Sequence, residues 1–243
     1  LVMDIKCGSG AFADNAGMAA ELAESILAVG ARLGLPATAL ITDMSQVLGR
    51  TAGNALEVLE SVQYLRGENV DERLHEVVME LGAALLHACG LNDSVAEARQ
   101  RLELAHGSGA ALDRFADMVT ALGGPVDFVE RPQDYMPPAQ VIVPVFPDSP
   151  GIVSAVDVRA VGNVVVELGG GRRLVSDELD FRVGLDDVAA PGDPVSADQP
   201  LAIVHAATDA AAELASEQLR AAFTLGDQGQ PGTLILDRLS AAK

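Results

Sequence analysis

In the first part of the chain, two short continuous apolar runs flank a segment whose apolar residues have helical spacing. Residues 1–6 form an apolar run that predicts a buried strand, and the glycine-rich segment 8–10 follows at once. Residues 14–33 place apolar side chains every three or four positions, and residues 37–42 form a second apolar run that ends at Asp43. This order predicts a right-handed βαβ unit with both strands in one parallel sheet, and binding loops lie at the carboxyl ends of such strands.

The remaining pattern divides into a helical part and a β-rich part. Helical spacing continues over residues 52–122 and predicts four helices. Glycine and proline then break the pattern, and the prolines at 132, 137 and 138 predict a linker. Beyond residue 139, alternating valines at 141–145 and 164–166 predict short strands, and residues 191–204 resemble a hairpin of a small β-sandwich. A helix over 208–224 and a strand near 233–237 are expected to close the chain.

These elements predict two domains. Residues 1–131 are expected to form part of an α/β domain with a parallel sheet and helices, and residues 132–139 a linker. Residues 140–243 are expected to form a C-terminal β-rich, barrel-sandwich-like (α+β) domain with the terminal helix and strand. Because a buried strand at residues 1–6 is normally covered by elements that precede it, the sequence is also expected to be a fragment whose N-terminal helical domain is absent.

Composition excludes several classes of protein. The chain has 49% hydrophobic and 21% charged residues, as soluble globular proteins do, and its apolar runs are too short to cross a bilayer. No signal peptide is recognisable, so a cytoplasmic location is expected. The net charge of −19 repels nucleic acid phosphates, and neither nucleic acid nor a membrane is an expected partner. Cys7 and Cys89 lack a second cysteine at metal-ligand spacing and are predicted to be reduced.

The only two lysines are Lys6 and Lys243, and Lys6 stands where the first strand enters its glycine loop. Strand alternation places Asp4 and Lys6 on the same face. The two residues are therefore candidates for a charged pair on the floor of a cleft, where they could orient a loop or an anionic substrate. A purely structural ion pair is the alternative.

Several longer segments carry a family resemblance. The chain resembles the thymidine and pyrimidine-nucleoside phosphorylases at residues 2–12 (VMDIKCGSGAF), 40–49 (LITDMSQVLG), 52–58 (AGNALEV), 168–173 (LGGGRR) and 176–177 (SD). The similarity extends in order from Leu1 to about residue 205, and corresponds to the C-terminal portion of the family.

The resemblance implies a pentosyltransferase that cleaves thymidine with phosphate into thymine and 2-deoxyribose 1-phosphate, in pyrimidine salvage. It implies a homodimer whose protomer has a small helical domain and a large α/β domain with a cleft between them. Phosphate is a co-substrate, and no organic cofactor is required. The family's catalytic, phosphate-binding and pyrimidine-holding residues are expected upstream of Leu1, so this chain alone is expected to be inactive.

The resemblance also assigns site residues within the chain. Phe12 corresponds to an apolar residue beside the pyrimidine ring, with simple loop packing as the alternative. Leu48, Thr51 and Glu60 match positions that hold a monovalent cation, usually potassium, in some members. Thr51 replaces a small apolar residue, which a backbone ligand tolerates, and Glu60 could otherwise be an ordinary solvated acid. The turn at residues 169–173 is expected to approach the cleft.

Three other functions are alternatives to this one. A phosphoribosyltransferase-like enzyme would need an acidic metal-diphosphate motif, and the long β-rich domain argues against it. A biotinyl or lipoyl carrier needs an acceptor lysine at a hairpin tip, and residues 140–205 contain no lysine. A non-catalytic fragment remains an alternative. The four histidines at positions 75, 87, 106 and 205 are predicted to be structural or surface residues.

Overall fold

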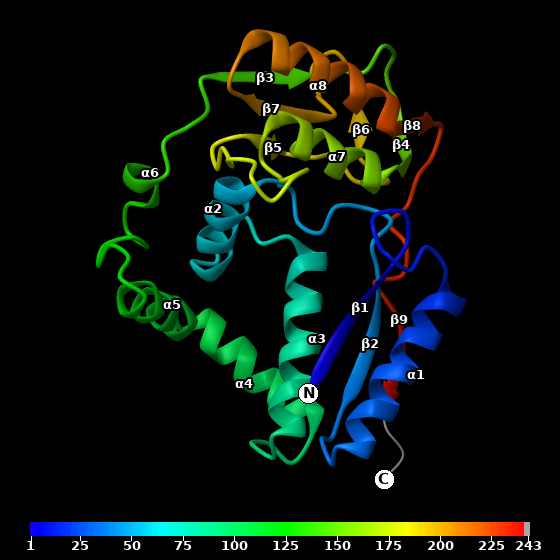
Figure 1. Cartoon of the computed structure of the whole chain (residues 1–243), viewed down its shortest axis with the longest axis vertical. Coiled ribbons are helices and arrows are strands. Elements are labelled where there is room, and N and C mark those ends of the chain that lie inside the picture. Colours follow the sequence, from blue (N-terminus) through cyan, green and yellow to red (C-terminus); the bar gives the residue numbers. More distant parts are fainter. Residues whose placement is uncertain (241–243) are drawn as a thin grey trace.

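The computed structural model describes residues 1–240, which form two units stacked along the long axis of the molecule (Figure 1). One unit contains the first sheet and the helices that follow it. The other contains two small sheets with two long helices, and it lies at the carboxyl ends of the first two strands (Figure 1).

The first unit is built on a mixed three-stranded sheet of order β1-β2-β9, formed by Val2–Cys7, Thr38–Asp43 and Ile235–Ser240. β1 and β2 pair in parallel with α1 (Ala16–Arg32) between them, as the predicted βαβ unit requires. β9 pairs with β2 in the antiparallel direction. The sheet is therefore not purely parallel, and the predicted strand near 233–237 joins this sheet rather than the β-rich unit that precedes it in sequence.

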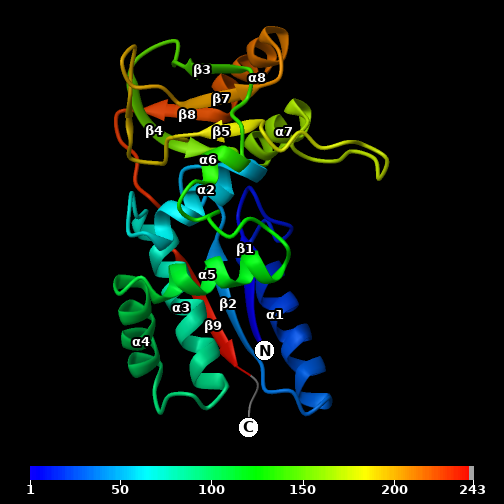
Figure 2. The same cartoon turned by 90° about the vertical axis from the view of Figure 1, so that its left-hand side faces the viewer.

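The helical series that follows was predicted correctly in type and number within the described residues. Its members are α2 (Asn54–Leu65), α3 (Glu72–Ala88), α4 (Val95–Gly107) and α5 (Ala110–Ala121). Two of these helices have polar N-cap residues: Asp71 and Ser94 accept hydrogen bonds from backbone N–H groups in the first turns of α3 and α4. A short helix α6 (Pro132–Tyr135) lies in the predicted linker, and the chain then passes to the second unit (Figure 2).

The second unit contains two three-stranded sheets, of orders β3-β7-β5 and β6-β4-β8. Their strands are β3 (Val141–Val145), β4 (Gly151–Val156), β5 (Gly184–Asp186), β6 (Pro194–Val195), β7 (Ala202–Ala206) and β8 (Phe223–Gly226). Helices α7 (Val158–Leu168) and α8 (Asp209–Ala222) pack beside one another on these sheets (Figure 1). The unit's core is made of small aliphatic side chains, including Val145, Val153, Val161, Val164, Leu185 and Leu219.

Two sequence predictions in this unit were wrong. The valines at 164 and 166 belong to helix α7 and not to a strand, because Val158, Val161, Val164 and Leu168 recur at helical spacing and all four are buried. Residues 191–204 do not form a hairpin, since β6 pairs with β4 while β7 pairs with β3 and β5. The turn between β6 and β7 is present, but it connects two different sheets.

The remaining global expectations concern cysteines and membranes. Cys7 is buried and Cys89 is exposed, and both are free thiols as predicted. Among residues 1–240, no helix has both the length and the apolar composition needed to span a bilayer.

Candidate functional site

The carboxyl ends of β1 and β2 meet at one edge of the first sheet. Cys7 pairs with Asp43, and the Met44 N–H donates to the Cys7 carbonyl at 2.7 Å. The Gly10 N–H in turn donates to the Met44 carbonyl at 3.0 Å, which joins the glycine loop to the turn after β2. Burial, with the nearby Asp43 carboxylate as a second cause, raises the pKa of the Cys7 thiol, so this thiol is protonated at neutral pH.

Asp4 and Lys6 are in contact on one face of β1. Lys6 Nζ lies 2.5 Å from Asp4 Oδ2, while Asp4 Oδ1 accepts a hydrogen bond from Thr42 Oγ1 of β2 at 2.5 Å. The side chains of Lys6 and Asp4 are 35% and 21% exposed. Because an ammonium group has three N–H donors, Lys6 keeps donors for a further acceptor at the end of β1.

Phe12 lies on the glycine loop and is 84% exposed, so its ring is not packed within the chain. The loop beneath it is held from the second unit. The Ser9 hydroxyl donates to the Val156 carbonyl at 3.2 Å, and a guanidinium N–H of Arg159 donates to the Ala11 carbonyl at 2.7 Å. An exposed aromatic ring on an anchored loop is suited to contact a flat ligand.

Glu60 lies on α2 and folds back onto the loop that follows β2. One oxygen accepts from the Arg50 backbone N–H at 2.6 Å, and the other accepts from Thr51 Oγ1 at 2.7 Å. A Cβ placed on Gly49 would come within 2.6 Å of the same carboxylate, so the loop backbone approaches Glu60 closely. The structure therefore brings Thr51 and Glu60 together.

Backbone carbonyls and a carboxylate are the types of ligand that a hard, weakly held cation takes. Leu48 and Thr51 carry backbone carbonyls within four residues of one another, and each Glu60 oxygen has a lone pair beyond its one hydrogen bond. Among residues 1–240, no group of three or more histidine, cysteine, aspartate and glutamate side chains could hold a metal ion. A cation here would therefore depend on carbonyl ligands together with the single carboxylate.

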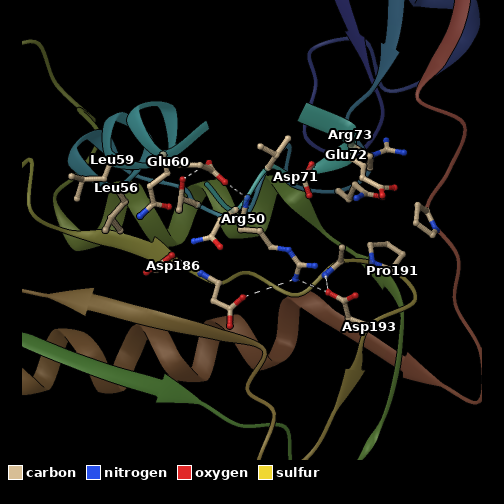
Figure 3. A pocket seen from close by; sticks show the side chains of 18 residues that line it. Arg50, Leu56, Leu59, Glu60, Asp71, Glu72, Arg73, Asp186, Pro191 and Asp193 are labelled. Carbon is tan, nitrogen blue, oxygen red and sulfur yellow. Dashed lines mark hydrogen bonds and ion pairs between the residues drawn. The ribbon is translucent and has the colours of Figure 1, made fainter. Parts of the chain in front are cut away.

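A cavity of about 640 Å³ lies between the two units (Figure 3). Thr51 and Glu60 line it, whereas Asp4, Lys6 and Phe12 are not among its lining residues. Most of its charged residues are acidic: Glu60, Asp71, Glu72, Asp186, Asp187 and Asp193. Arg50 reaches across to Asp193 with an N–O distance of 2.8 Å, which Figure 3 shows as a dashed line.

A second charged pair connects three separate segments beside this cavity. Arg73 at the start of α3 lies 2.9 Å from Asp43 at the end of β2, and their side chains are only 16% and 9% exposed. Arg73 also donates to the Gly232 carbonyl at 2.6 Å, just before β9. Asp43 therefore shapes the edge where β1 and β2 end.

Three of the histidines contact neighbouring residues of the fold. His75 and His106 surround the Tyr64 ring, with the Tyr64 hydroxyl 3.0 Å from His75 Nδ1 and its carbonyl 2.7 Å from His106 Nε2. Burial raises the pKa of Tyr64 and lowers the pKa of His205, and these shifts favour the neutral form of each side chain. His87 lies 3.2 Å from the Asn92 carbonyl at the end of α3.

The turn at residues 169–173 contacts helix α2 rather than the glycine loop. Asn54 Nδ2 donates to the Gly170 carbonyl at 2.8 Å. The Asp177 carboxylate accepts from the Arg173 and Leu174 N–H groups and closes the turn. The turn therefore lies beside the face of α2 that carries Asn54 and Val58, whereas Glu60 lines the cavity between the two units.

Sequence reasoning did not identify Arg50, Arg73, Arg159 or Asp193 as site residues. Each makes its principal contact with a residue at least 30 positions away. The periodic spacing of residues indicates which side chains share a face of one helix or strand. It does not indicate contacts between residues far apart in the sequence, so these pairs could not be predicted from it.

Comparison with known proteins identifies two matched domains and a set of relatives. Residues 1–112 match the model of the glycosyl transferase family a/b domain, and residues 152–226 match that of the pyrimidine nucleoside phosphorylase C-terminal domain. Proteins named thymidine phosphorylase from Burkholderia lata and Burkholderia cenocepacia are each 48% identical over 239 residues. The alignments cover 98% of this chain and 55% of each relative, so the chain spans about half the length of these relatives.

Each matched domain lies within one of the two units of the fold, and the glycine loop with Phe12 lies where the units meet. The chain is therefore homologous to the thymidine phosphorylases over 98% of its own length, and it combines a glycosyl transferase family a/b domain with a pyrimidine nucleoside phosphorylase C-terminal domain.

Proposed function

We propose that the protein acts in the phosphorolysis of thymidine and related pyrimidine deoxynucleosides to the free base and 2-deoxyribose 1-phosphate. The 48% identity to thymidine phosphorylases, spread over 98% of the chain, carries this proposal. Because the chain spans 55% of those relatives, we expect the 243-residue chain by itself to lack most of the active site and to be inactive.

In this reaction a phosphate oxygen forms a bond to C1′ as the bond from C1′ to the pyrimidine nitrogen breaks. The bonding electron pair leaves with the pyrimidine, which takes up a proton. We propose that Phe12 packs beside the pyrimidine, at the 5-methyl edge of thymine. Asp4 and Lys6 would form part of the cleft floor, and the residues that bind phosphate would lie outside this chain.

We further propose that the Leu48 and Thr51 carbonyls and the Glu60 carboxylate hold a potassium ion. The contacts of Glu60 with the loop at residues 49–51 support this assignment. The ion would fix the loop that connects β2 to α2, and phosphate would remain a co-substrate without an organic cofactor.

The proposed domain organisation follows the prediction with one adjustment. Residues 1–131 and the strand β9 would form the α/β domain, residues 132–139 the linker, and residues 140–226 the β-rich domain. The two sheets β3-β7-β5 and β6-β4-β8 support a barrel-sandwich-like arrangement for that domain. We propose a homodimer acting in the cytoplasm, on the basis of the family resemblance.

The function is tested by supplying or withholding phosphate. Natural protein containing this chain is expected to release thymine from thymidine with 10 mM phosphate (roughly ten times a typical substrate KM), and the yield of 2-deoxyribose 1-phosphate is expected to equal that of thymine. In phosphate-free buffer the release is expected to fall at least roughly a hundredfold, because the bound phosphate that forms the new bond to C1′ is missing. Thymine release at an equal rate without phosphate would identify a hydrolase and contradict the proposal.

The cation site is tested by titrating potassium into the active protein. Glu60→Gln is expected to raise the potassium concentration for half-maximal activation roughly tenfold, because a hard cation loses its only charged ligand. Glu60→Ala is expected to show a larger rise, and Glu24→Ala on the exposed face of α1 serves as the control. Identical potassium curves for the wild type and both Glu60 variants would remove the assignment.

A further inference from the structure

The glycine loop after β1 is attached to the second unit through a small set of polar contacts. Ser9 bridges two backbone groups there, donating to the Val156 carbonyl at 3.2 Å and accepting from the Val158 N–H at 3.3 Å. Val158 is the first residue of α7, and the N–H groups in the first turn of a helix have no partner within the helix. Ser9 therefore satisfies one of those groups and fixes the base of the loop.

Arg159 fixes the tip of the same loop. Its guanidinium donates to the Ala11 carbonyl at 2.7 Å, and this is the only hydrogen bond found for that carbonyl within residues 1–240. Ala11 is buried, whereas the next residue, Phe12, is 84% exposed. The position of the Ala11 peptide sets the direction in which Phe12 projects, because the two residues share that peptide group.

Packing restricts the middle of the loop. A Cβ on Gly10 would lie 2.5 Å from Val158 Cγ1, so the loop backbone is pressed against the first residue of α7. The Gly10 N–H also donates to the Met44 carbonyl on the opposite side. The loop is thus held between the end of β2 and the start of α7, and it can shift only if one of these contacts breaks.

We propose that Arg159 is a positioning residue for nucleoside binding, which acts from the C-terminal β-rich unit by holding the Ala11 carbonyl and thereby aiming Phe12 at the pyrimidine. Ser9 supports it at the base of the loop. This inference rests on the proposed function, since it takes the pyrimidine as the ligand of Phe12. The second unit, which contains none of the residues proposed to contact the nucleoside, would in this way contribute to the affinity for thymidine.

The test compares steady-state kinetics of the natural, active protein with those of Arg159→Ala, Arg159→Lys and Arg220→Ala. Arg220 is the matched control, because it also donates to a backbone carbonyl, that of Phe146 at 3.0 Å, but within the second unit and away from the loop. Arg159→Ala is expected to raise the KM for thymidine roughly tenfold, as loss of a charge-assisted hydrogen bond does. The KM for phosphate and kcat are expected to stay within about twofold, because the loop does not hold phosphate and ring contacts persist into the transition state.

The conservative variant separates positioning from simple destabilisation. Arg159→Lys is expected to recover part of the thymidine affinity, since an ammonium can still donate to the Ala11 carbonyl. A thymidine KM within twofold of wild type in Arg159→Ala, or an equal rise in Arg220→Ala, would overturn the proposal. So would a fall in kcat alone, which a merely structural role predicts.

Hydrogen exchange separates failure of this inference from failure of the proposed function. If the wild-type protein releases no thymine with phosphate, the proposed function fails, and exchange of the Gly10 and Ala11 amides then tests the loop contact alone. Arg159→Ala is expected to speed their exchange roughly tenfold relative to wild type and Arg220→Ala. Unchanged exchange rates in Arg159→Ala would overturn the positioning role whatever the activity.

Discussion

Gly184→Ala is expected to lower the free energy of unfolding by about 3 kcal/mol, because the new methyl group would collide with backbone atoms that cannot move aside. Its Cβ would lie 2.4 Å from the Ala52 carbonyl oxygen and 3.0 Å from Gly53 Cα. The backbone at Gly184 also has a φ of +155°, which residues other than glycine rarely adopt. The measurement is urea unfolding followed by circular dichroism.

The reason for so large an effect is the place of Gly184 in the molecule. Ala52 and Leu185 exchange two backbone hydrogen bonds of 2.8 and 2.9 Å, which join the loop before α2 to strand β5. The methyl group would separate these segments and loosen the contact between the two units. The loop that carries Thr51 would shift with them.

The control is Gly162→Ala, at an exposed position inside α7 with no atom near the added methyl group. This variant is expected to be more stable than wild type by up to about 1 kcal/mol, because alanine loses less backbone entropy in a helix. Equal stabilities for Gly184→Ala and wild type would show that the backbone approach at Ala52 is not as close as the structure has it.

Asp43→Ala is expected to destabilise the protein by about 3 kcal/mol, because it leaves the largely buried Arg73 guanidinium without its counter-charge. The two groups are 2.9 Å apart and almost wholly shielded from water. Asp43 also accepts from the Ser45 N–H at 3.1 Å, so the turn after β2 loses a contact as well. The same urea titration measures the effect.

Two further variants sharpen this result. Asp43→Ala combined with Arg73→Met is expected to recover part of the lost stability, since no unpaired charge then remains buried. Asp117→Ala removes one partner of an exposed pair, in which Arg114 and Asp117 side chains are 84% and 69% exposed. Asp117→Ala is expected to lower the free energy of unfolding by less than about 1 kcal/mol. If Asp43→Ala lowered the free energy of unfolding by an equally small amount, solvent would have access to the Asp43–Arg73 pair.

The sequence pattern predicted the first unit more closely than the second. The βαβ unit and the four following helices were recognised because their apolar positions recur over long stretches, and tertiary contacts did not alter that spacing. In α7 the pattern was ambiguous. Five valines between 158 and 166 favour a strand by composition, but their helical spacing buries one face against α8 and the sheets.

Some of the candidate site residues could be predicted from the sequence, and others could not. Asp4 and Lys6 were expected on one face of a strand, and their contact follows from the two-residue period of that strand. The assignments of Phe12, Leu48, Thr51 and Glu60 came from the family resemblance and remain proposals. Arg50, Arg73 and Arg159 were not recognised, because an arginine in a sequence does not indicate which distant carbonyl or carboxylate it contacts.

By itself, the sequence determined the type and order of most elements, the family, and the place of a glycine loop at the end of a strand. These features depend on local spacing and on contiguous motifs, which a linear pattern contains. Only the tertiary structure decided that β9 returns to β2, that β6 and β7 join different sheets, and that α7 holds the glycine loop. Those outcomes depend on which buried surfaces and unpaired backbone groups meet between segments that are far apart in the sequence, and no local pattern specifies that choice.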